Sequence, residues 1–163
     1  MTKIKICGLT RMEDILAVNV LRPDYIGFVF AKSRRQIDGR QAKQLKKYLH
    51  PGIAAVGVFV NGDLEWEADL FRQGIIDWIQ LHGQEDEEAV RRLKNLTARY
   101  AGREVCVIKA LSMDHAQELE VWQESRADYL LLDHGTGGSG KAFDHRILCT
   151  KKIKKPFFLA GGI

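Results

Sequence analysis

Short apolar runs alternate with longer amphipathic segments along this chain, and the alternation predicts strands and helices in turn. The predicted strands cover residues 3–7, 25–30, 53–60, 77–81, 104–109, 128–133 and 155–160. The predicted helices lie around residues 15–21 and over residues 39–50, 63–72, 84–100, 113–125 and 144–152. Asp63, Ser112 and Asp144 stand where three of these helices begin, and each is a residue type that favours the N-cap position.

The predicted strands begin about 25 residues apart, which is a typical length for one strand–helix unit. Repeated units of this kind form a parallel sheet, either an open doubly wound sheet or a closed barrel. Units of near-equal length without a long crossover favour the barrel. The polar residues that follow most of the strands also favour it, because these strand ends converge on one face of a barrel.

The predicted fold class is therefore α/β, a (β/α)8 TIM barrel with about seven strands in this chain. An eighth unit would need roughly 40 further residues for a helix, a strand and a second helix. We expect residues 1–163 to form a single barrel domain in which this C-terminal helix-strand-helix is missing. The first and seventh strands would then have unpaired edges, so we expect low stability or association with another chain.

Composition narrows the classes of protein that fit. The 163 residues are 45% hydrophobic and 28% charged, and no apolar run reaches the ~18 residues of a membrane span. Three widely spaced cysteines, Cys7, Cys106 and Cys149, indicate a reducing cytoplasm and argue against a metal cluster. The net charge of +4 suits an anionic metabolite or a nucleic acid, but no nucleic-acid motif accompanies it. We therefore expect a cytoplasmic protein with no membrane, nucleic-acid or metal partner.

The strongest candidate for chemistry is Asp133, which ends an apolar strand and precedes a loop with four glycines. A carboxylate at a strand end can act as an acid or base, and backbone N–H groups of a glycine-rich loop can bind phosphate. A turn or helix cap followed by a flexible connector is the structural alternative. The stretch from Gly135 to Lys141 also approaches the nucleotide-binding P-loop pattern. Ala142 follows where that pattern needs a Mg²⁺-binding hydroxyl, which argues against ATP or GTP binding.

A set of short motifs extends from one end of the chain to the other in a fixed order. These are residues 5–10 (KICGLT), 27–30 (GFVF), 32–35 (KSRR), 56–61 (VGVFVN), 80–83 (QLHG), 107–110 (VIKA), 131–133 (LLD), 137–144 (GGSGKAFD) and 160–162 (AGG). Each motif alone carries little information, but the ordered set is specific. It resembles the phosphoribosylanthranilate isomerases of tryptophan biosynthesis.

This resemblance implies an Amadori rearrangement of N-(5′-phosphoribosyl)anthranilate to 1-(2-carboxyphenylamino)-1-deoxyribulose 5-phosphate, with no cofactor. Asp133 matches the general acid of the family and Cys7 matches its general base. Arg35 is the expected partner of the anthranilate carboxylate, and the adjacent Arg34 is the alternative. The remaining expected substrate-binding residues are Gln80, His82, Gly138, Ser139, Gly140, Gly161 and Gly162, the glycines and Ser139 through backbone N–H groups.

Two other functions stay open at this point. One is another phosphate-binding barrel enzyme of amino-acid biosynthesis, although Cys7 together with Asp133 argues against the relatives in histidine and indole biosynthesis. The other is a non-catalytic barrel fragment that retains affinity for phosphate. For His82, a hydrogen bond that stabilises its loop is an alternative to lining the pocket. A monomer and a homodimer fit the sequence equally well.

Overall fold

The computed structural model describes residues 2–113, 117–133 and 153–161. Strands and helices alternate along these residues in the order β1, α1, β2, α2, β3, α3, β4, α4, β5, α5, β6, β7. The strands are β1 Lys5–Cys7, β2 Tyr25–Val29, β3 Ala54–Phe59, β4 Trp78–Leu81, β5 Cys106–Ser112, β6 Tyr129–Asp133 and β7 Phe157–Leu159. The helices are α1 Met12–Leu21, α2 Gly39–Lys46, α3 Leu64–Arg72, α4 Glu87–Ala101 and α5 Glu118–Gln123.

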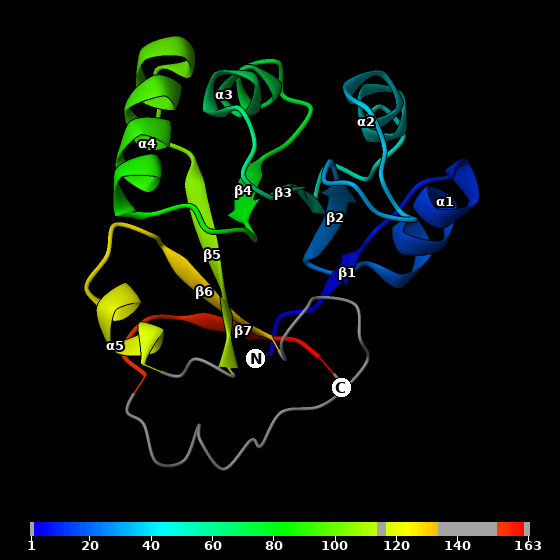
Figure 1. The fold of residues 1–163 in the computed structure, drawn as a ribbon. Coiled ribbons are helices and arrows are strands. Elements are labelled where there is room, and N and C mark those ends of the chain that lie inside the picture. Colours follow the sequence, from blue (N-terminus) through cyan, green and yellow to red (C-terminus); the bar gives the residue numbers. More distant parts are fainter. Residues whose placement is uncertain (1, 114–116, 134–152, 162–163) are drawn as a thin grey trace.

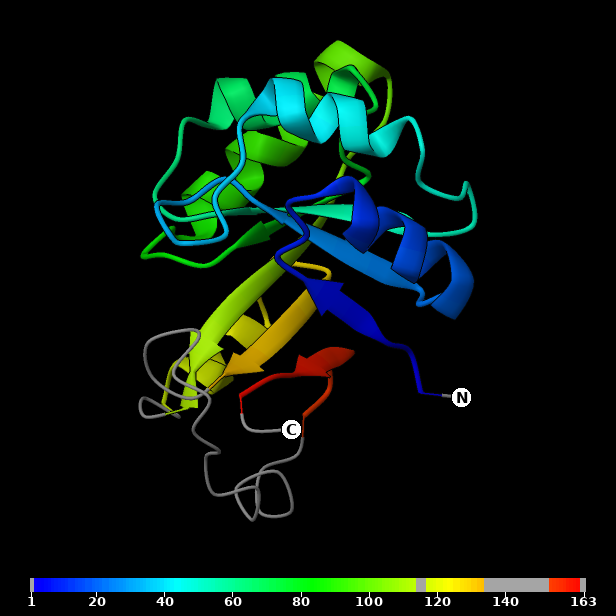
Figure 2. The same cartoon turned by 90° about the vertical axis from the view of Figure 1, so that its right-hand side faces the viewer.

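All neighbouring strands are parallel, and their order in the sheet, β1 to β7, follows the chain. The sheet curls so that β7 turns back toward β1, with the helices on its outer side (Figures 1 and 2). An open doubly wound sheet would instead reverse its strand order at a switch point. The curled sheet therefore confirms the barrel architecture. Within the described residues, β1 and β7 are not paired with each other.

The alternation of side chains along each strand gives the sheet two apolar faces. The larger one packs the outward-facing residues of the sheet, such as Ile26 and Phe28, against helix residues such as Ile15. A smaller one fills the inside of the curl and includes Tyr25 and Val56. A further cluster of Leu111, Leu119 and Leu130 lies against α5. Inside the curl, four aromatic rings lie side by side. They are Tyr25, Trp78, Tyr129 and Phe158, with neighbouring ring centroids 4.8 to 5.7 Å apart.

Three aspartates stand one residue before β2, β4 and β6, and each contacts the preceding neighbour strand. Asp24 accepts a hydrogen bond from the backbone N–H of Ile4, Asp77 from that of Ala55 and Asp128 from that of Val107, at 2.7 to 2.8 Å. Asp77 and Asp128 also pair with Lys46 and Lys94. These contacts fix the register at the N-terminal ends of the strands.

Several predicted helix bounds differ from the structure, such as α2, which was expected to reach residue 50 and ends at Lys46, and the largest difference is at α5. The helix expected over residues 113–125 spans only Glu118–Gln123, and Ser112 ends β5 and is not an N-cap. The reason is the sheet, because Ala110, Leu111 and Ser112 pair with Leu131, Leu132 and Asp133 of β6 and extend the strand. Asp63 is the N-cap of α3 as predicted. Asp144 and the helix predicted over residues 144–152 lie outside the described residues. Among the helices that the structure describes, none is long and apolar enough to cross a membrane.

Candidate active site

The two proposed catalytic residues each end a parallel strand, Cys7 at β1 and Asp133 at β6. The C-terminal ends of parallel strands lie on the same face of the curled sheet, so both side chains belong to one mouth. Asp133 is 8% exposed and Cys7 is half-buried. A deeply set carboxyl group and a free thiol are thus available on the face where barrel enzymes carry out their chemistry.

Two glycines shape the surroundings of Cys7. Gly27 lies opposite Cys7 in the pairing of β1 with β2, and a Cβ atom there would come 2.5 Å from the Cys7 Sγ. Gly8 has a φ of +92°, and a Cβ atom there would come 2.6 Å from the Arg35 Cδ. The Arg35 guanidinium crosses Gly8 and donates from Nη1 to the carbonyl oxygen of Cys7 at 3.1 Å. The loop after β2 therefore brings a positive charge to the backbone of Cys7.

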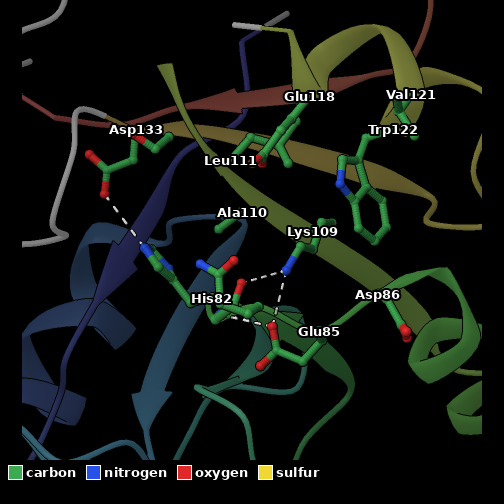
Figure 3. A pocket seen from close by; sticks show the side chains of 13 residues that line it. His82, Glu85, Asp86, Lys109, Ala110, Leu111, Glu118, Val121, Trp122 and Asp133 are labelled. Atoms are coloured by element: carbon green, nitrogen blue, oxygen red, sulfur yellow. Dashed lines mark hydrogen bonds and ion pairs between the residues drawn. The ribbon is translucent and has the colours of Figure 1, made fainter. Parts of the chain in front are cut away.

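His82 connects Asp133 to β4. Its Nε2 lies 3.7 Å from the Asp133 Oδ2 (Figure 3). Its Nδ1 lies 2.8 Å from the Nε2 of Gln80, the third residue of β4. With the Gln80 amide donating to Nδ1, the neutral ring carries its proton on Nε2, toward Asp133. Burial lowers the pKa of His82, and nearby Lys5 and Lys109 add to this, while Asp133 raises it. The environment thus favours a neutral imidazole.

A cavity of about 380 Å³ opens beside this group, between the turn after β4, the end of β5 and helix α5. Asp133 and His82 line one side of it, and Trp122 lines the other (Figure 3). Lys109 and Glu85 form an ion pair in its wall, with 3.0 Å between Nζ and Oε2. The cavity is large enough to hold part of a small organic molecule next to the Asp133 carboxyl group.

Comparison with known proteins identifies the chemistry that this mouth serves. The family model of N-(5′-phosphoribosyl)anthranilate (PRA) isomerase matches residues 4–163. The chain belongs to this family. PRA isomerases are enzymes of tryptophan biosynthesis, so the match selects this family over the other phosphate-binding barrel enzymes.

Individual PRA isomerases agree with the family match. The isomerase of Clostridium kluyveri is 44% identical over 163 residues, which are all of this chain and 77% of that protein. The crystal structure of the isomerase from Thermus thermophilus superposes with a TM-score of 0.82 at 32% identity, covering 99% of this chain and 78% of that one. Another solved PRA isomerase, 32% identical with a TM-score of 0.79, is in complex with reduced 1-(o-carboxyphenylamino)-1-deoxyribulose 5-phosphate, and the match covers all of this chain and 77% of that one.

The expected PRA isomerase site residues fall into two groups in the structure. Cys7 and Arg35 are in contact at the ends of β1 and β2, and Gln80, His82 and Asp133 are in contact at the ends of β4 and β6. The contact with Cys7 is made by Arg35, which distinguishes it from the adjacent Arg34. Within the described residues, the His82 ring contacts Gln80 and Asp133, which places it in the mouth. Gly161 follows β7 with a φ of +82°, and Gly138, Ser139, Gly140 and Gly162 lie outside the described residues.

Two buried carboxyl groups near the mouth were not predicted. Glu85 is 9% exposed, and Glu67 in α3 is fully buried against Gly62, where a Cβ atom would come 2.5 Å from its Oε1. Burial raises the pKa of Glu67 to about 8, with the charges of Glu85 and Asp63 adding to the effect. A signal for Glu67 exists in the sequence, because it falls on the same helical face as the apolar residues Leu64 and Phe71.

Proposed function

We propose that Asp133 and Cys7 are the general acid and general base by which this chain isomerises N-(5′-phosphoribosyl)anthranilate. The observation that carries the proposal is their common placement: a deeply set carboxyl group and a free thiol end two strands of one barrel mouth. The family reaction needs one group that gives a proton and another that takes one. These two side chains have the required chemistry and lie on the required face.

The reaction follows from these roles as a series of proton transfers. Asp133 donates its proton to the furanose ring oxygen, the C1′–O bond breaks, and the anthranilate nitrogen lone pair forms the C=N bond of a Schiff base. Cys7, in its deprotonated form, then removes the proton from C2′, and the electron pair moves to give an enolamine. The enolamine tautomerises to the ketone as C1′ takes the proton held by Cys7 and the C2′ hydroxyl proton passes to Asp133, so both side chains regain their starting forms. Each step is a proton transfer or a rearrangement of bonds within the substrate, so the route uses no cofactor.

His82 supports the acid in this scheme. A neutral imidazole that carries its proton on Nε2 can hydrogen-bond the Asp133 carboxylate once that group has given up its proton. Gln80 holds the opposite ring nitrogen and so fixes the tautomer. The pair therefore stabilises the form of Asp133 that appears during ring opening.

Substrate binding is proposed from charge and from backbone geometry. Arg35, beside Cys7, is suited to pair with the anthranilate carboxylate through two parallel hydrogen bonds. Gly161, with its positive φ, is the described member of the proposed phosphate site. The phosphorylated ligand in the related crystal structure supports a phosphorylated substrate here. The cytoplasmic setting stays a prediction, which rests on the free thiols of Cys7 and Cys106. The single barrel domain over residues 1–163 also stays a prediction.

The test is the loss of anthranilate fluorescence when the purified chain meets freshly prepared substrate. We expect turnover by the unaltered chain and a fall in kcat of about 10²- to 10⁴-fold in Asp133→Asn and in Cys7→Ser. Cys106→Ser is the matched control. Burial raises the pKa of the Cys106 thiol to about 12, so this thiol stays protonated and cannot accept a proton from the substrate. Near-native turnover in Asp133→Asn or Cys7→Ser would show that the assigned role is wrong.

A further inference from the structure

Two oppositely charged side chains, one in the turn after β4 and one on the adjacent strand β5, are almost completely buried. Lys109 of β5 is 3% exposed, and Glu85, in the turn, is 9% exposed. Their contact is the 3.0 Å ion pair described above, and the Lys109 ammonium also lies 5.2 Å from the centre of the Trp122 ring. A buried ion pair contributes little net stability after its charges have lost their hydration, so its presence at the mouth calls for another explanation.

Both side chains also hold the backbone of Gly83. The Lys109 Nζ donates to the Gly83 carbonyl oxygen at 2.7 Å, and the Gly83 N–H donates to the Glu85 Oε2 at 2.8 Å. The other carboxylate oxygen of Glu85 accepts from the N–H of Asn61 at 2.6 Å, which ties the turn to the end of β3. A Cβ atom on Gly83 would come 2.5 Å from the Asn61 Oδ1, so the turn has no room to shift in that direction.

Gly83 directly follows His82, so the same contacts determine where the His82 ring lies. The His82 backbone N–H donates to the Phe59 carbonyl oxygen at 2.8 Å, and the next peptide group is held by Lys109 and Glu85. The ring then extends toward Asp133 (Figure 3) and contacts Gln80 through its other nitrogen. Lys109 itself alternates along β5 with Ile108 and Ala110, whose side chains join the inner apolar cluster. It therefore acts on the mouth from behind the sheet.

We propose that Lys109 and Glu85 are positioning residues for the isomerisation, which hold the Gly83 peptide so that the His82 ring stays beside Asp133. The inference rests on the proposed function, because it assigns the ion pair a part in that reaction. The pair also carries a charge effect, since Lys109 lowers the pKa of His82 and Glu85 raises it. The groups that face His82 from the packed elements are Asp133, Lys5, Lys109 and Glu85.

The experiment measures kcat, KM and the His82 titration, the last by NMR of the ring protons, in Lys109→Met and Glu85→Gln. We expect kcat to fall about tenfold to hundredfold in Lys109→Met while KM changes less than threefold. The pKa of His82 should rise in Lys109→Met, which removes a cation, and fall in Glu85→Gln, which removes an anion. A general loosening of the fold would instead shift the pKa of His82 in the same direction in both variants.

Lys94→Met is the matched control. Lys94 is 5% exposed and its Nζ lies 2.8 Å from the Asp128 Oδ2, so it is an equally buried paired lysine, at the opposite end of the strands. We expect this variant to lose stability and to keep kcat and the His82 titration. Equal effects of Lys94→Met and Lys109→Met on the His82 titration would overturn the proposal.

A second variant covers the case in which Lys109→Met does not fold. Lys109→Met combined with Glu85→Leu removes both charges and leaves neither one buried alone. A native His82 titration and native kcat in this double variant would overturn the positioning role, whereas lower kcat with an altered His82 titration would support it. If the unaltered chain shows no turnover, the proposed function fails, and the His82 titrations still decide whether the ion pair positions the ring.

Discussion

The two ends of the same parallel strands are built differently. At the N-terminal ends, aspartates satisfy backbone N–H groups, lysines pair with two of them, and four aromatic rings fill the inside of the curl. At the C-terminal ends, charged and polar side chains are packed together with incomplete partnering. Barrels concentrate stability at the first end and catalysis at the second, and this chain shows the physical form of that division.

Polar groups with no partner mark the C-terminal end. Among the described residues, the Oε1 of buried Gln80 and both carboxylate oxygens of Glu67 make no hydrogen bond. Such atoms reduce stability, since they lose hydration without gaining a partner. At the N-terminal end, Asp128 accepts from both Val107 and Lys94. The contrast indicates that the mouth is arranged for reaction at some expense of stability, whereas the other end is arranged for stability.

Removing an aromatic ring from the N-terminal end should have the largest effect on stability. Tyr25 is 4% exposed, and its ring contacts those of Trp78 and Phe158. Tyr25→Ala should lower the free energy of unfolding by about 3 kcal/mol, the cost of a large cavity in a core. Denaturant titration measures this value. Tyr48→Ala is the control: Tyr48 is 61% exposed and should cost less than about 0.5 kcal/mol. Equal losses in the two variants would show that the aromatic layer has no special role.

At the C-terminal end, by contrast, a substitution should raise the free energy of unfolding. Glu67→Gln should flatten the pH dependence of stability. The Glu67 pKa of about 8 lies above its ordinary value of 4.5. Between these values the folded state binds more protons than the unfolded state, so stability falls as pH rises from about 4.5 to 8. We expect the variant to gain about 1 kcal/mol on the native chain for each pH unit in this window.

Unfolding midpoints of both chains, measured from pH 5 to 8.5, test this effect. The comparison between chains removes the contribution of groups that titrate in both. Parallel stability curves would contradict the assignment of a buried, protonated Glu67. Glu67 lies beneath the turn that carries Asn61 and Gly62, and below pH 7 its carboxyl group is neutral, as the Gln amide is. Turnover below pH 7 should therefore change little in the variant.

Part of this division could be predicted from the sequence. The regular spacing of apolar runs predicted all seven described strands, and Asp133 and Cys7 were predicted as strand-end residues. The end of β5 could not be predicted, because Ala110 and Leu111 fit a strand or a loop equally well until β6 pairs with them.

The ion pair behind the mouth was also beyond the sequence pattern. Lys109 and Glu85 are 24 residues apart, and only the fold brings the turn after β4 against β5. By contrast, the sequence itself carries a repeat at the strand starts: Asp24-Tyr25, Asp77-Trp78 and Asp128-Tyr129 each place an aspartate before an aromatic residue. With strand spacing already predicted, that repeat would have indicated the aromatic layer and its aspartates.

The smallest of these effects should separate two aspartates of that repeat. Asp128 accepts from Val107 and pairs with Lys94, which is buried, whereas Asp24 accepts from Ile4 in an exposed contact. Asp128→Asn keeps one acceptor but leaves the lysine with only the more distant carboxylate of Glu104, 3.7 Å away, and should lower the free energy of unfolding by about 1–2 kcal/mol. Asp24→Asn should lower it by only a few tenths of a kcal/mol. Denaturant titration of both variants measures the difference, and turnover should be unchanged in the folded fraction of each. If Asp24→Asn costs as much as Asp128→Asn, the hydrogen bond to the neighbouring strand, and not the buried lysine, is what stabilises this end of the sheet.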